Sequence, residues 1–140
     1  MKIEKQKGFS LIELLVVVTI IGTVSAIAVP MLKRAIIASE NGNTFATTKV
    51  MLQEQFNFYS QNARYARLDE LNARYGNGFG STVNNEILRG KFTFAMSPAN
   101  PSDADLRQNF EIIATRTLDN AEVPYVLSID ATGEAVQILP

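Results

Sequence analysis

One long apolar run near the N-terminus limits what this chain can fold into. Residues 9–32 contain a single charged side chain, Glu13, and the 19 residues from Leu14 to Leu32 are all uncharged. A helix that rises about 1.5 Å per residue crosses a hydrocarbon layer about 30 Å thick with about 20 residues. The run is therefore long enough to span a membrane as a helix.

Lysines on one side of the run predict its orientation. Lys2, Lys5 and Lys7 precede it, with one glutamate among them. Lysines beside a first hydrophobic helix resist translocation. We therefore expect the basic residues before the run to stay in the cytoplasm, the helix to cross a membrane once, and everything after Lys33 to lie outside.

A cleaved secretory signal peptide is the alternative interpretation of this run. It has a basic start and an apolar stretch, and Ala26-Ile27-Ala28 has the small residues of a signal peptidase site. Two features weigh against it. The run exceeds the usual 7 to 15 apolar residues, and a carboxylate costs about 2.5 to 3.5 kcal/mol at the centre of an inserted helix. On this alternative the chain is a secreted binding or adhesion domain released near Ala28.

The composition excludes several classes of function. The 140 residues carry a net charge of −1 and include neither histidine nor cysteine. Without them there is no Ser-His-Asp or Cys-His nucleophile, no zinc ribbon and no disulfide. A near-neutral chain also lacks the basic excess expected of a nucleic-acid-binding domain. We predict no enzymatic activity, no cofactor, no metal and no nucleic acid partner.

The start of the apolar run resembles a known processing motif. Residues 7–15, KGFSLIELL, look like the prepilin processing motif of type IV pilins and type II secretion pseudopilins, and Gly22 and Pro30 follow at that family's usual spacing. The resemblance implies that prepilin peptidase cuts after Gly8 and methylates the new amino group on Phe9. A glycine suits the cut because it has no Cβ to obstruct a narrow protease cleft.

The same resemblance implies a role for Glu13 and a set of partners. In the family this glutamate pairs with the N-terminal amine of a neighbouring subunit, and a buried carboxylate and a buried ammonium each offset the other's cost. The chain would then be a structural subunit of a type IV pilus or a type II secretion pseudopilus. Its partners would be copies of itself and related pilins, the prepilin peptidase, the inner-membrane assembly platform and, before assembly, membrane lipid.

Two helix-weakening residues interrupt the span. Proline inside a helix costs about 3 kcal/mol or more, and glycine costs about 1 kcal/mol relative to alanine. In the pilin family the stretch between such residues can extend when subunits assemble. Gly22 and Pro30 are therefore our candidates for the limits of a segment that melts.

Beyond Lys33 the helix is expected to continue over residues 33–62. Four large side chains fall within about 60° of one face at 100° per residue, and we expect them to be the core surface on which a small sheet packs: Phe45, Leu52, Phe56 and Tyr59. Residues 39–43, Ser-Glu-Asn-Gly-Asn, are the weak place, because an Asn-Gly pair is a turn signal.

The rest of the chain predicts a small α+β head. A short helix is expected at residues 66–74, followed by a loop at 75–85 that contains three glycines and three asparagines. Apolar and polar residues alternate at 92–96, 110–115 and 125–130, as in strands with one buried face. A hairpin turn at 130–133, with Gly133 in the left-handed conformation, leads into a last strand at 136–139.

Acidic loop residues are the last chemical candidates. Asp103 and Asp105 fall in one predicted loop, and Asp119 and Glu122 in the next. Oxygen ligands of this kind can bind calcium, but charges in a loop are usually solvated, and we predict no metal site.

The expected organisation is thus α+β and resembles a pilin. It comprises a leader (1–8), a membrane-spanning or filament-core helix (9–32), its amphipathic continuation (33–62), an αβ-loop region (63–90) and an antiparallel sheet head (91–140).

Overall fold

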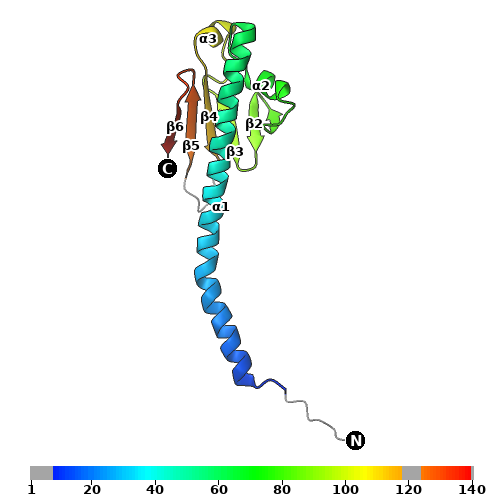
Figure 1. Cartoon of the computed structure of the whole chain (residues 1–140), viewed down its shortest axis with the longest axis vertical. Helices are drawn as coiled ribbons and strands as arrows, with labels where there is room; N and C mark the ends of the chain where they lie inside the picture. Colours follow the sequence, from blue (N-terminus) through cyan, green and yellow to red (C-terminus); the bar gives the residue numbers. More distant parts are fainter. Residues whose placement is uncertain (1–7, 118–123, 140) are drawn as a thin grey trace, which may run out of the picture. The chain divides into compact units, whose positions relative to one another are not determined.

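The computed structural model describes residues 8–117 and 124–139, which contain one long helix, two short helices and an antiparallel sheet (Figure 1). The helix, α1, runs from Leu11 to Asn62. The chain divides into two compact units between Ser39 and Glu40. In its described part the first unit consists of residues 8–39 and contains the N-terminal part of α1.

The second unit combines the C-terminal part of α1 with two short helices and one sheet. Its further elements are α2 (Leu68–Arg74), β1 (Ser81–Val83), β2 (Glu86–Arg89), β3 (Phe92–Met96), α3 (Asp103–Gln108), β4 (Glu111–Arg116), β5 (Val126–Asp130) and β6 (Ala135–Leu139). The six strands lie in chain order and each neighbouring pair is antiparallel. The predicted α+β class, a long helix followed by an antiparallel sheet, is confirmed.

Alternation along the strands places the core between the sheet and α1. Side chains of β3 and β5 are buried at every second position, as their period of two requires. These side chains form one apolar cluster with Met51, Leu52 and Phe58 of α1. The C-terminal part of α1 therefore lies along one face of the sheet (Figure 1).

The sheet starts at Ser81, not at residue 91 as predicted. The loop expected over residues 75–85 contains β1, and β1 pairs with β2 across Asn84 and Asn85. Both asparagines have positive φ, +50° and +66°. Asparagine tolerates this conformation, and two such residues make the tight turn that suits a β-hairpin. Asn84 and Asn85 therefore form the turn of a hairpin, whereas the sequence pattern predicted them at the end of a loop.

The helix also continues through residues 39–43, where the Asn-Gly pair indicates a bend. The predicted turn at 130–133 forms, with Gly133 at φ +85°. The second predicted acidic loop, with Asp119 and Glu122, lies outside the described residues.

Gly80 is the glycine whose replacement we expect to destabilise the head most. Its φ is +147°, and a Cβ there would lie 2.3 Å from the carbonyl oxygen of Leu88. Gly76 also has positive φ, +65°, but no atom lies near its Cβ position. Gly76→Ala should therefore cost about 1–2 kcal/mol of unfolding free energy, and Gly80→Ala should cost clearly more because the clash adds to the strain.

Urea unfolding of the full chain in detergent micelles, followed by tyrosine fluorescence, measures this difference. All four tyrosines lie in the second unit, so the signal reports the head. Equal midpoints for the two variants would show that the Leu88 contact contributes nothing.

Candidate functional site

The start of α1 closes on itself through Ser10 and Glu13. The backbone N–H of Ser10 donates to Glu13 Oε2 at 2.7 Å, and the backbone N–H of Glu13 donates to Ser10 Oγ at 3.3 Å. This reciprocal pair is a capping box, which satisfies two N–H groups that a helix start leaves without partners. The carboxylate is therefore held at the N-terminal end of α1, where the helix dipole favours negative charge.

The two residues before this cap are open to their surroundings. Phe9 is 90% exposed, and no heavy atom lies within 4 Å of the position that a Cβ on Gly8 would occupy. The peptide bond between Gly8 and Phe9 is thus not covered by any described part of the chain. In the intact precursor the nitrogen of Phe9 is an amide, and cleavage of this bond would turn it into an ammonium group four residues before Glu13.

Apolar side chains lie on all sides of α1 between the cap and Leu32. All residues of α1 up to Ile36 are exposed, and their apolar side chains project on every side of the helix. Within the residues that the structure describes, α1 is the helix long and apolar enough to cross a membrane. The hydroxyls of Thr19 and Thr23 donate to the carbonyls of Leu15 and Ile20 at 2.8 and 2.9 Å. These hydroxyls thus need no partner outside the helix.

Gly22 and Pro30 both lie inside this continuous helix. Proline has no N–H, so the carbonyl four residues earlier, on Ala26, receives no backbone hydrogen bond from position 30. The structure therefore describes the segment in its helical form.

The predicted core stripe of α1 is only partly correct, because Phe56 and Tyr59 contact the ring of the buried Tyr65 but are not buried themselves. Leu52 is buried, but the other three members remain substantially exposed: Phe45 (41%), Phe56 (41%) and Tyr59 (38%). The face that packs on the sheet is instead formed by Thr44, Thr47, Thr48, Met51, Leu52, Gln55 and Phe58. At 100° per residue this face is rotated by roughly 90° from the predicted one.

Polar residues occupy the buried face because each finds a partner within the chain. The hydroxyls of Thr44, Thr47 and Thr48 donate to carbonyls four residues earlier in α1, at 2.7 to 3.0 Å. Gln55, which is fully buried, donates to the carbonyl of Ala66 at 2.8 Å and accepts from its N–H at 2.7 Å. Satisfied polar groups can be buried at little cost, and a search for apolar periodicity misses them.

Asp103 and Asp105 belong to α3 rather than to the predicted loop. Asp105 forms a capping box with Ser102, whose hydroxyl donates to it at 2.6 Å. This hydroxyl, together with the backbone N–H of Ser102, holds the pKa of Asp105 below its usual range. Asp103 accepts from Arg67 at 2.6 Å. The loop prediction missed the Ser102–Asp105 capping pattern, which is visible in the sequence.

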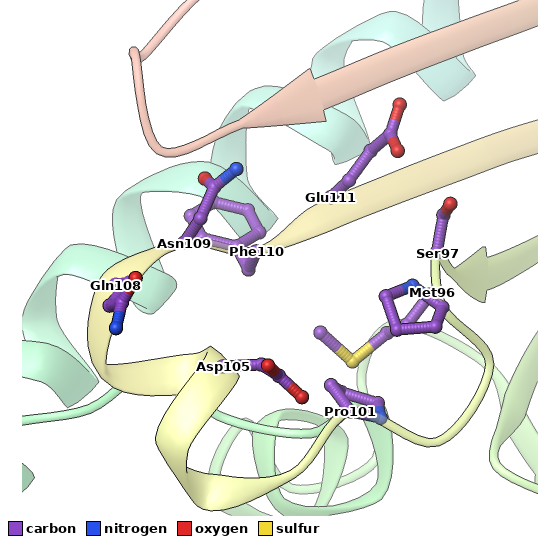
Figure 2. A pocket seen from close by; sticks show the side chains of 9 residues that line it. Met96, Ser97, Pro101, Asp105, Gln108, Asn109, Phe110 and Glu111 are labelled. Atoms are coloured by element: carbon purple, nitrogen blue, oxygen red, sulfur yellow. The ribbon is translucent and has the colours of Figure 1, made fainter.

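A hollow of about 300 Å³ lies beside α3 (Figure 2). Asp105 and Glu111 line it, with Asn109 at its edge. Each has a partner in the chain: Ser102 for Asp105, the Ser128 hydroxyl at 3.0 Å for Glu111, and the N–H of Ala131 at 3.3 Å for Asn109. In residues 8–117 and 124–139, no group of three or more acidic side chains is placed to hold a metal ion. We assign the hollow no function.

The N-terminus is also the part of the chain that matches a known protein family. Residues 4–29 match the family model described as the prokaryotic N-terminal methylation motif. No solved structure matches the chain. The matched residues include Gly8, Phe9 and Glu13 and extend into the apolar part of α1. The chain therefore carries the N-terminal methylation motif of type IV pilins and pseudopilins.

Proposed function

We propose that the chain is a structural subunit, cut after Gly8, methylated on Phe9, and polymerised into a type IV pilus or a type II secretion pseudopilus. The observation that carries this proposal is the methylation motif at residues 4–29 together with the N-terminal part of α1, up to Ile36, whose apolar surface no described part of the chain covers. Water is a poor environment for such a surface. The apolar surface of α1 therefore needs contact with lipid before assembly and with other helices afterwards.

Glu13 gives the assembly its register. In the single chain its carboxylate accepts the N–H of Ser10. In the proposed filament it faces the methylated ammonium of Phe9 on a neighbouring subunit. Neither charge is stable when buried alone, and their attraction offsets the cost of burial only when the two groups meet. Helices that slide out of register lose this compensation.

Gly22 and Pro30 allow α1 to change length during assembly. The helix between them already lacks the hydrogen bond that proline cannot donate, and glycine lowers its stability further. We propose that this segment extends when the subunit leaves the lipid and enters the filament. Its neighbours there would be copies of the chain or related pilins.

The proposed path starts in the bacterial inner membrane. The lysine-rich leader lies in the cytoplasm and the sheet domain lies outside, so that prepilin peptidase meets the Gly8–Phe9 bond at the inner surface. The assembly platform of the same membrane then moves the mature subunit into the filament.

Fractionation of cells that produce the full chain tests this function. We expect the chain in the inner membrane and in filaments that sediment after shearing. A chain found only as a soluble monomer in the periplasm or the medium would contradict the proposal and favour the secreted binding domain.

A further inference from the structure

Residues 39–43 have little intrinsic reason to be helical, although they lie inside α1. The segment reads Ser-Glu-Asn-Gly-Asn, and serine, asparagine and above all glycine are poor helix formers. None of its five side chains is buried, so core packing does not compensate for the low helix propensity. The segment begins at the boundary of the two compact units. Its helical state therefore needs a specific support.

Arg116, the last residue of β4, provides that support. Its side chain is completely buried, although arginine is rarely found in this environment. Nη2 donates to Glu40 Oε2 and Nη1 donates to Asn41 Oδ1 at 3.0 Å. One planar guanidinium thus contacts two consecutive residues of the weak segment and fixes both side chains at once.

The sheet holds Arg116 itself in place. Its backbone N–H donates to the carbonyl of Tyr125 at 3.0 Å, and its guanidinium carbon lies 5.7 Å from the centre of the Phe92 ring. Phe92 pairs directly with Arg116 across β3 and β4. The cation is therefore attached to the rigid part of the head, whereas its two helix partners belong to a segment that is weak alone.

We propose that residues 39–43 are a latent hinge in α1, which Arg116 keeps in the helical state. Removing the guanidinium removes its hydrogen bonds to Glu40 and Asn41. The low helix propensity of residues 39–43 stays unchanged. The segment should then unwind locally while the sheet stays folded. Gly42 offers the reciprocal change, because no atom lies within 4 Å of its Cβ position and alanine there raises helix propensity without a clash.

Amide hydrogen exchange of the full chain in lipid nanodiscs, measured by mass spectrometry, tests the hinge. In Arg116→Met we expect peptides covering residues 39–47 to exchange at least about tenfold faster than in the parent chain, since the segment loses two hydrogen bonds from a charged donor. Adding Gly42→Ala to this variant should slow that exchange about fivefold. Gly42→Ala alone should change it little, because the parent segment is already held.

Peptides from β3 and β5 serve as the control, since their exchange should not change. If Arg116→Met unfolds the sheet, Glu40→Gln removes the ion pair from the helix side and becomes the deciding variant. Unchanged exchange over residues 39–47 with a folded sheet would overturn the proposal. Loss of protection in the sheet and in the segment together, in both variants, would also overturn it, because the segment would then have no independent opening.

Discussion

Gly8→Val should leave the chain as an uncleaved, membrane-bound precursor. The added side chain would enter a protease cleft that glycine fits, and a single extra methylene in a tight pocket already changes kcat/KM by roughly 10- to 200-fold. The variant should still fold and insert, because the space around Gly8 is open and α1 begins three residues later. The measurement is the fraction of cleaved chain in membranes that contain prepilin peptidase.

Gly42→Ala is the matched control for this experiment. It also adds a side chain at an open glycine position, but far from the motif, and should be cleaved like the parent chain. Normal cleavage of Gly8→Val after residue 8 would refute the role assigned to this glycine. Cleavage that moves to the region of Ala28 would favour a signal peptide.

Glu13→Ala should insert into the membrane normally but be almost absent from filaments. Without the carboxylate, a neighbour's ammonium is buried alone, and removing one partner of a buried ion pair costs about 3–5 kcal/mol, or roughly a hundredfold or more in incorporation. The measurement is the ratio of filament-bound to membrane-bound chain.

Two further variants separate the charge of Glu13 from its cap. Glu13→Gln keeps a side chain that can accept the N–H of Ser10 and loses only the charge. Ser10→Ala keeps the charge and removes the hydroxyl that caps Glu13, at about 1 kcal/mol of helix stability. We expect Glu13→Gln to fail like Glu13→Ala and Ser10→Ala to assemble. The opposite pattern would mean that the cap, not the charge, directs assembly.

The sequence predicted the parts of the fold that depend on one strong periodic signal. The apolar run is helical from Leu11 onward, and strands lie at all three alternating stretches and at the C-terminal segment after the 130–133 turn. The first hairpin was missed because β1 has only three residues, all exposed, and its turn uses Asn84 and Asn85 instead of a glycine. Short edge strands carry almost no hydrophobic pattern.

The head-packing face was only partly predicted, for a different reason. Apolar periodicity selected Phe45, Phe56 and Tyr59, whereas hydrogen bonds within the chain make it possible to bury Thr48 and Gln55. The contact between Arg116 and Glu40 joins residues far apart in the sequence, so no local sequence pattern predicts it. In contrast, Gly8, Phe9 and Glu13 were candidates from the start, because their motif is local and contiguous.

The mass of the intact mature chain, purified from the cells that produce it, tests the central claim most directly. Our account predicts a mature chain that begins at Phe9 and carries one additional methyl group on its N-terminal nitrogen. A mature chain that begins after Ala28, without the apolar helix and without Glu13, would contradict it.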